Sequence, residues 1–130
     1  LRMLRKLKRP LLYIDVDCRL KEVPEGLADA MLVDDVGTIE NAVKHHKCRI
    51  SGGLWAVANS DAAEFFLTMW MIRCASPKNQ HRPDHPLMME VMREAAKPSS
   101  GSVNFCDLTE MFAGRWEVNA LDDAKNTYTG

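Results

Sequence analysis

The chain has 130 residues, and its 18 acidic and 17 basic residues leave a net charge of -1 at pH 7. This balance argues against a general nucleic-acid binder, because no overall positive field would concentrate a polyanion. An apolar fraction of 46% with three tryptophans excludes a disordered chain. We expect residues 1–130 to form a single domain with its own core, and no apolar run is long enough to span a bilayer.

The four cysteines are far apart in the sequence, without a CxxC pair or a nearby histidine at ligand spacing; they are Cys18, Cys48, Cys74 and Cys106. This pattern favours free thiols in a reducing compartment over a disulfide framework or a zinc site. We therefore expect a cytoplasmic protein.

The first nine residues, LRMLRKLKR, alternate leucines with basic residues. Their spacing predicts the last turns of an amphipathic helix, which Pro10 would end. A targeting peptide is the alternative, but the segment has no serine enrichment and directly precedes a predicted strand. Because the chain opens inside a helix–strand unit and without methionine, we expect sequence to precede it.

Residues 11–17, LLYIDVD, run from four apolar residues into two aspartates. The apolar run predicts a central strand of a parallel sheet, covered on both faces. Strand periodicity would then place Asp15 and Asp17 on the same side of the backbone, where a divalent cation could neutralise their repulsion. Two solvated loop aspartates are the alternative.

Further along, residues 30–36 (AMLVDDV) read as a short second strand, and residues 38–46 are compatible with one helical face. Residues 48–59 predict a strand interrupted by Gly52 and Gly53. Glycines inside a strand indicate a bulge or a close approach to the backbone.

Two helices are predicted next, the first capped by Asn59 or Ser60 and the second by Asp84, with Pro86 in its first turn. The second helix carries an apolar stripe facing the core, made of Leu87, Met88, Val91, Met92 and Ala95. Residues 103–108 and 114–119 predict two short strands, and the polar tail 122–130 is expected to fray.

In this order, the elements resemble the C-terminal part of the catalytic domain of the GT-A-fold nucleotide-diphospho-sugar glycosyltransferases. The DxD motif of that family is similar to Asp15-Val16-Asp17, its small-residue strand and tryptophan helix to residues 51–70, and its Asp-Gln pair to Asp84-His85. The resemblance covers residues 1–95. It implies an α/β fold, a GT-A-like mixed sheet flanked by helices that lacks the N-terminal nucleotide-binding strands.

The resemblance also implies an enzyme that transfers a sugar from a nucleotide-diphosphate sugar to a hydroxyl acceptor. Asp15 and Asp17 would hold Mn²⁺ or Mg²⁺, with Asp15 also contacting the ribose or a metal-bound water. Gly52 and Gly53 would let the donor sugar approach the backbone. Asp84 would be the catalytic residue, as a hydrogen-bond partner of the sugar or a base, and His85 would contact substrate.

The chain departs from that pattern in three ways. His85 stands where the family has glutamine, no late histidine motif supplies a third metal ligand, and the strands that grip the nucleobase are absent. We therefore expect a fragment of a transferase catalytic domain.

Two alternatives belong to other classes. The strand followed by DVD is also similar to the haloacid-dehalogenase-like phosphatases, although Arg19 and Leu20 do not match their motif. The third possibility is a catalytically inactive sugar-binding or structural domain.

Overall fold

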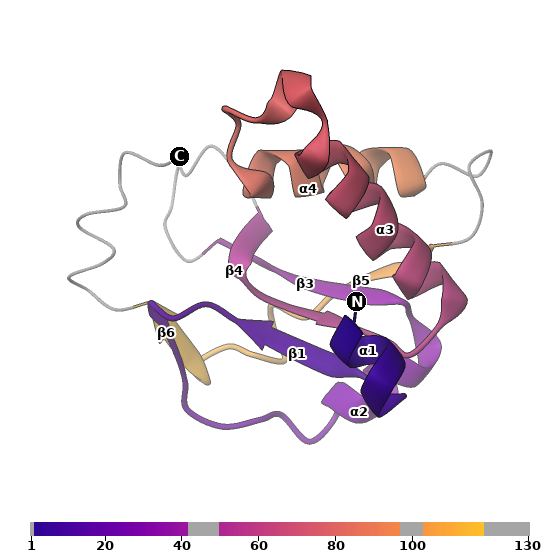
Figure 1. Cartoon of the computed structure of the whole chain (residues 1–130). Coiled ribbons are helices and arrows are strands. Elements are labelled where there is room, and N and C mark those ends of the chain that lie inside the picture. Colours follow the sequence, from indigo (N-terminus) through magenta and orange to yellow (C-terminus); the bar gives the residue numbers. More distant parts are fainter. Residues whose placement is uncertain (1, 42–49, 97–102, 119–130) are drawn as a thin grey trace.

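The computed structural model describes residues 2–41, 50–96 and 103–118 (Figure 1). The helices are α1 (Arg2–Leu7), α2 (Leu27–Val33), α3 (Asp61–Ala75), the short 3₁₀ helix η1 (Pro77–Asn79) and α4 (Asp84–Ala95). The strands are β1 (Leu11–Ile14), β2 (Cys18–Leu20), β3 (Val36–Glu40), β4 (Ile50–Val57), β5 (Phe105–Asp107) and β6 (Trp116–Val118). No helix within these ranges is long and apolar enough to cross a membrane.

The main sheet is mixed, with the strand order β1-β4-β3-β5. Strand β4 runs antiparallel to both of its neighbours, whereas β3 and β5 are parallel. Strands β2 and β6 form a separate antiparallel ribbon. The fold is therefore mixed α/β with helices packed on the sheet, as predicted in its broad class.

The predicted position of β1 is wrong. Among the described strands it pairs with β4 alone, in the antiparallel direction, so it lies at an edge of the sheet. Leu11 packs into the core on one face and Leu12 and Ile14 into the core on the other. Because side chains are covered on both faces even at this edge, the sequence reads as an apolar run without alternation, as a central strand would.

Helices α3 and α4 lie together over one face of the sheet, and α2 lies on the opposite side (Figure 1). The core beneath α3 and α4 joins side chains from α1, the sheet and both helices, with Leu4, Phe66, Met88 and Val91 fully buried. Four of the five residues in the predicted stripe of the second helix are buried, and Met92 is partly buried against the same core.

A second core fills the opposite face of the sheet. It joins α2 to the sheet and to the segment that follows β5, with Leu54, Ile39 and Phe112 among its buried members. Residues 27–33 form helix α2 instead of the predicted strand over 30–36, and residues 36–40 form β3 instead of part of a helix. Residues 42–49, which carried the rest of that helical prediction, and the tail 122–130 lie outside the described residues.

The start of α3 confirms the predicted cap. The Ser60 hydroxyl accepts a hydrogen bond from the Ala63 backbone N–H at 3.1 Å and donates one to Asp35 at 2.7 Å. The other Asp35 oxygen accepts from the Asn104 N–H at 2.8 Å. Asp35 thus ties the start of β3 to α3 and to the segment that leads into β5, which explains why the carboxylate is needed at this position.

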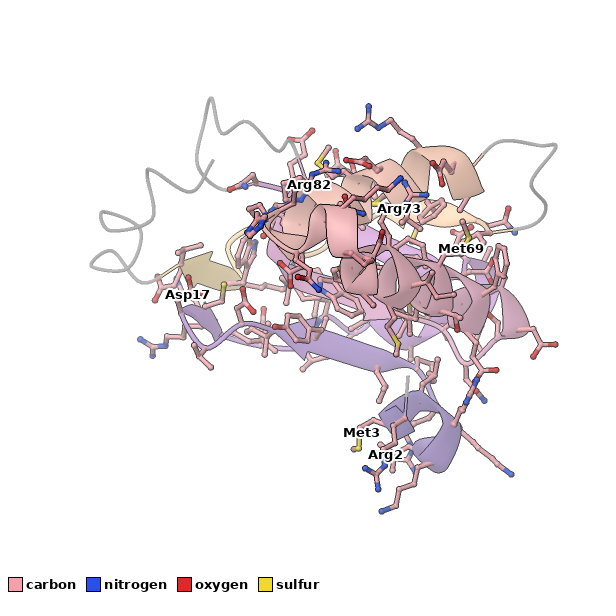
Figure 2. The ribbon with its side chains drawn as sticks, turned by 45° about the horizontal axis from the view of Figure 1, so that its top comes forward. Arg2, Met3, Asp17, Met69, Arg73 and Arg82 are labelled. Carbon is pink, nitrogen blue, oxygen red and sulfur yellow. The ribbon has the colours of Figure 1, made fainter. Side chains whose placement is uncertain are left out.

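Ion pairs join α3 to α4. Arg73 contacts Glu94 at 2.5 Å and Glu90 at 3.4 Å, and Arg82 also pairs with Glu90. Figure 2 shows Arg73 and Arg82 on the same side of the helical layer. The hydrogen bond from Arg82 is the main reason that the pKa of Glu90 is lowered. These contacts hold the loop before α4, and with it the position of Asp84.

The neighbouring phenylalanines of α3 give a matched test of the core. Phe66 is fully buried, whereas Phe65 is 48% exposed. We expect Phe66→Ala to lower the free energy of unfolding by about 3–5 kcal/mol, because it leaves a cavity between α3 and the sheet. Phe65→Ala should cost less than about 1 kcal/mol. Urea unfolding monitored by circular dichroism measures both, and equal losses would contradict this packing.

Candidate functional site

The two aspartates of the DVD motif lie in a tight turn directly after β1. The Asp15 backbone N–H donates to the Gly53 carbonyl at 2.8 Å, and the Cys18 N–H donates to the Asp15 carbonyl at 3.0 Å. The turn ends the strand before Asp17, so the side-chain alternation assumed from the sequence stops at Ile14. Asp15 is therefore anchored to β4, and Asp17 is placed by the turn.

Negative charge gathers around Tyr13. Its hydroxyl donates a hydrogen bond to the Asp15 carboxylate, and this bond is the main reason that the pKa of Tyr13 rises to about 12. Burial adds to the shift, and so do the negative charges of Asp15, Asp84 and Asp17. Because all three carboxylates act on one phenol, the structure brings together the acidic residues that the sequence analysis singled out on separate elements.

The pKa of Cys18 is also raised, by burial and by the negative charges of Asp17 and Asp15. Its thiol donates to an Asp17 carboxylate oxygen at 3.6 Å. Burial, followed by the charge of Asp17 and the hydrogen bond to it, raises the pKa of Cys18 to about 12. The thiol therefore stays protonated at neutral pH and is a poor nucleophile. It acts as a donor that helps to orient the second aspartate of the motif.

The two glycines of β4 sit where the strand bends. The pairing of β3 with β4 shifts register between Thr38 and Glu40, an irregularity that falls in this part of β4. A Cβ at Gly53 would lie 2.8 Å from the Cys18 sulfur and 3.6 Å from an Asp15 oxygen. A Cβ at Gly52 would lie 2.9 Å from the His85 ring. Of the two predicted explanations of these glycines, the close approach is confirmed.

The prediction that Asp84 caps α4 is wrong. Pro83 occupies the cap position, and no side chain makes a capping hydrogen bond there. Asp84 is the first residue of the helix and is exposed, and its backbone carbonyl accepts a hydrogen bond from the Trp70 indole at 3.0 Å. Since its carboxylate does not cap the helix, it can face a ligand.

His85 is packed against the protein. One ring nitrogen is hydrogen-bonded to the carbonyl of Ile50, and the ring lies over Gly52. His85 thereby fastens the start of α4 to the bend of β4. The ring is only partly buried, so one side of it still borders the surface.

Three aromatic rings, those of Tyr13, Trp55 and Trp70, form a row between Asp15 and Asp84. Tyr13 stacks on Trp55 with 4.8 Å between ring centroids, and Trp55 meets Trp70 edge to face at 5.5 Å. Trp70 in turn holds the backbone of Asp84 and, with it, lines a surface hollow of about 530 Å³. Within the described residues, the buried indole nitrogen of Trp55 has no hydrogen-bond partner.

Sequence reasoning missed Tyr13 as a site residue. The signal was available, because residues 13 and 15 are two positions apart at the end of a strand. The segment that resembles the family's tryptophan helix ends at Trp70, but the contact of Trp70 with the Asp84 backbone depends on the packing of α3 against α4. Trp55 lies between Tyr13 and Trp70.

Comparison with known proteins gives one informative match. No protein-family profile matches the sequence, and no curated protein matches it either. The fold is similar to the crystal structure of a glycosyltransferase involved in the glycosylation of the major capsid of PBCV-1, with a TM-score of 0.55 and 13% identity. The match covers 99% of this chain and 72% of that one. The predicted structural resemblance to a glycosyltransferase is confirmed, and at this identity it concerns the fold alone.

The contact between Gly53 and Cys18 predicts an energetic coupling. Gly53→Ala should lower the free energy of unfolding by about 1–3 kcal/mol, because the new methyl group overlaps the Cys18 sulfur. In a Cys18→Ala background the same change should cost at least about 1 kcal/mol less. A double-mutant cycle by urea unfolding measures this difference.

Gly52→Ala is the matched control for that cycle. It meets His85 and not Cys18, so its cost should add to that of Cys18→Ala without coupling. If the losses of unfolding free energy caused by Gly53→Ala and Cys18→Ala simply add in the double mutant, the Cys18 sulfur does not occupy the space above Gly53.

The Tyr13–Asp15 hydrogen bond predicts a pH dependence. The folded state holds the phenolic proton more tightly than the unfolded chain, whose ordinary tyrosine pKa is about 10. Stabilisation by this contact is therefore fully present below pH 10 and is lost as the pH rises towards 12. In Asp15→Asn the pKa of Tyr13 should fall towards 10.

Absorbance titration of tyrosinate measures this pKa. The chain has two tyrosines, so a Tyr128→Phe background isolates Tyr13. An unchanged titration in Asp15→Asn would contradict the hydrogen bond.

Proposed function

We propose that the chain forms the donor-binding and catalytic part of a glycosyltransferase, which moves a sugar from a nucleotide-diphosphate sugar to a hydroxyl acceptor. The observation that carries the proposal is the turn after β1, which is anchored to Gly53 of β4 and presents the partly exposed Asp15 and Asp17, with Asp84 within electrostatic range of Tyr13. The fold shared with a solved glycosyltransferase supports it. Its place in a larger catalytic domain, with nucleobase-binding strands outside residues 1–130, is part of the proposal, as is a cytoplasmic location.

The donor set fits a hard divalent cation that shares its coordination with a substrate. Asp15 and Asp17 are both partly exposed and offer carboxylate oxygens from one turn. Among residues 2–41, 50–96 and 103–118, no cluster of three or more His, Cys, Asp or Glu could hold a metal ion by itself. Mg²⁺ and Mn²⁺ suit such a site, because Mg²⁺ commonly binds through one or two carboxylates together with substrate phosphates.

The bound cation would supply Lewis-acid stabilisation of the diphosphate leaving group. The chain's own residues would prepare the site for it. Tyr13 donates to one oxygen of Asp15 and so fixes the direction of that carboxylate, and Cys18 does the same for Asp17. In this proposal Asp17 is the principal metal ligand, and Asp15 contacts the ribose or a metal-bound water.

The donor sugar would lie along the bend of β4. The space beside the Gly52 backbone is filled by His85, and the space beside the Gly53 backbone is filled by Cys18. These two side chains would therefore border the sugar, with His85 taking the place of the family's glutamine. The Ile50 carbonyl orients the His85 ring, which limits the sugars that the ring can contact.

Asp84 would act at the reacting end of the donor. Its carboxylate is exposed at the first turn of α4 and does not cap the helix. It would either accept the proton of the acceptor hydroxyl as that oxygen attacks the anomeric carbon, or hydrogen-bond the donor sugar. The hollow beside Trp70 and Asp84 would give an acceptor access to this carboxylate.

Calorimetric titration of the full-length protein with UDP- and GDP-sugars, with and without Mn²⁺, tests the proposal. We expect binding that requires Mn²⁺ and that weakens by about tenfold or more in Asp17→Ala, since a metal ligand is lost. Asp29→Ala is the matched control, because Asp29 is an exposed aspartate on α2, away from the DVD turn, and should leave affinity unchanged.

Each alternative predicts a different result. Metal-dependent binding that survives Asp17→Ala would contradict the metal assignment. Hydrolysis of a chromogenic phosphate ester in Mg²⁺ would favour the phosphatase class. Absence of metal-dependent nucleotide binding by the full-length protein would favour an inactive sugar-binding or structural domain.

A further inference from the structure

Helix α1 and the residues after it carry a concentrated positive charge. Five of the eight residues from 2 to 9 are basic and none is acidic, although the whole chain has a net charge of -1. The five basic residues are all exposed: Arg2, Arg5, Lys6, Lys8 and Arg9. The balanced total charge therefore conceals a strongly basic end of the molecule.

Large apolar side chains are exposed on the same surface. Met3 and Leu7, one helical turn apart on α1, are 54% and 40% exposed. Leu32 and Val33, at the end of α2, are 80% and 77% exposed. Lys8 and Arg9, which follow α1, line one hollow of about 280 Å³ together with Leu32 and Val33 of α2, so these basic and apolar residues are neighbours.

Three of the nearby carboxylates interact with other groups of the protein. Glu64 pairs with Arg5 at 2.6 Å, and Asp35 accepts hydrogen bonds from Ser60 and Asn104. Asp34 lies close to Cys106, where it adds to the effect of burial in raising the pKa of that thiol to about 11. In the part of the chain that the structure describes, the other four basic residues of this end form no ion pair.

The basic end projects away from the body of the molecule. Figure 2 shows Arg2 and Met3 pointing outward from α1, well away from Asp17. Leu4 is the buried residue of α1, and it anchors the helix to the core. Apart from Arg5, which pairs with Glu64, the other side chains of α1 are exposed within the described residues: Arg2, Met3, Lys6 and Leu7.

We propose that this end of the molecule, the α1–α2 surface, docks on an anionic lipid bilayer. It is made of the five basic residues together with Met3, Leu7, Leu32 and Val33. Basic side chains would meet the negative headgroups while the apolar ones enter the interface, and stable attachment to a membrane surface takes two such signals. A nucleic acid would match the charge but would not bury Leu32 and Val33, so the bilayer fits both features. The inference does not depend on the proposed transferase activity.

Co-sedimentation of the purified chain with lipid vesicles tests the proposal. The probes are vesicles of phosphatidylcholine alone and vesicles with about one third phosphatidylserine. We expect binding to the anionic vesicles only, weakened by added salt. Lys6→Glu with Lys8→Glu should reduce the partition coefficient by about tenfold or more. Leu32→Ser with Val33→Ser should reduce it by about tenfold without any change in charge.

Lys78→Glu with Arg93→Glu is the matched control. It makes the same change in net charge at exposed positions on η1 and α4, and it should leave vesicle binding within about twofold. All substituted side chains are exposed, so each variant should fold, and thermal unfolding checks this.

Three outcomes would overturn the proposal. The first is absence of binding to the anionic vesicles. The second is an equal loss in the control pair, which would indicate a general charge effect. The third is vesicle binding that Leu32→Ser with Val33→Ser leaves unchanged, together with equally strong binding of an oligonucleotide. This result would indicate a nucleic-acid-binding surface.

Discussion

The pairing of β4 with its two neighbours, and its bend at Gly52 and Gly53, is the constraint on which the candidate site depends. The Gly53 carbonyl accepts from Asp15, which fixes the turn of the DVD motif, and the Ile50 carbonyl bonds His85, which fixes the start of α4. One strand thereby sets the position of both acidic segments. A side chain at either glycine would displace Cys18 or His85, so the small residues are required by close approach and not by flexibility.

Three carboxylates of the candidate site, those of Asp15, Asp17 and Asp84, lie within electrostatic range of Tyr13. The raised pKa values of Tyr13 and Cys18 both report this field, and both groups keep their protons as donors to the carboxylates. Like charges at short range repel each other, and a divalent cation with its phosphate ligands relieves that repulsion. The proposed ligand, a metal-bound diphosphate, would relieve such repulsion, and the fold is similar to that of a solved glycosyltransferase.

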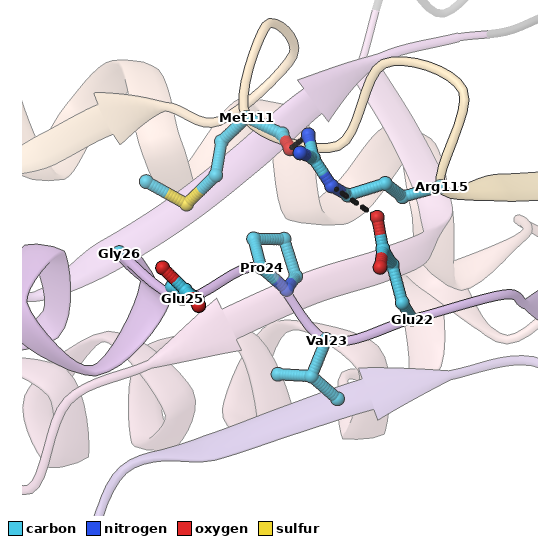
Figure 3. A pocket seen from close by; sticks show the side chains of 7 residues that line it. All are labelled: Glu22, Val23, Pro24, Glu25, Gly26, Met111 and Arg115. Atoms are coloured by element: carbon cyan, nitrogen blue, oxygen red, sulfur yellow. Dashed lines mark hydrogen bonds and ion pairs between the residues drawn. The ribbon is translucent and has the colours of Figure 1, made fainter.

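Charge is distributed unevenly along the molecule. Asp15 and Asp17 directly follow β1, and the five basic residues of the α1–α2 surface precede β1 in the chain. A net charge of -1 excludes an overall attraction to polyanions but says nothing about such local surfaces. Figure 3 shows a further hollow on the α2 side of the molecule. There Arg115 forms an ion pair with Glu22 at 2.8 Å and donates a hydrogen bond to the Met111 carbonyl. Its arginine is satisfied within the protein, which favours a structural role.

The sequence by itself determined the elements whose signals are local. The Ser60 cap, the apolar stripe of α4 and the glycine-broken strand β4 were all predicted correctly, because each depends on neighbours within a few residues. Only the tertiary structure decided that β1 lies at an edge of the sheet and that residues 27–33 form a helix. It also decided that Pro83, and not Asp84, occupies the N-cap position of α4. The tertiary structure also brings His85 against Gly52 and places Asp84 within electrostatic range of Tyr13. Such contacts join residues far apart in the chain. They follow from strand order and helix packing, which short-range sequence patterns do not specify.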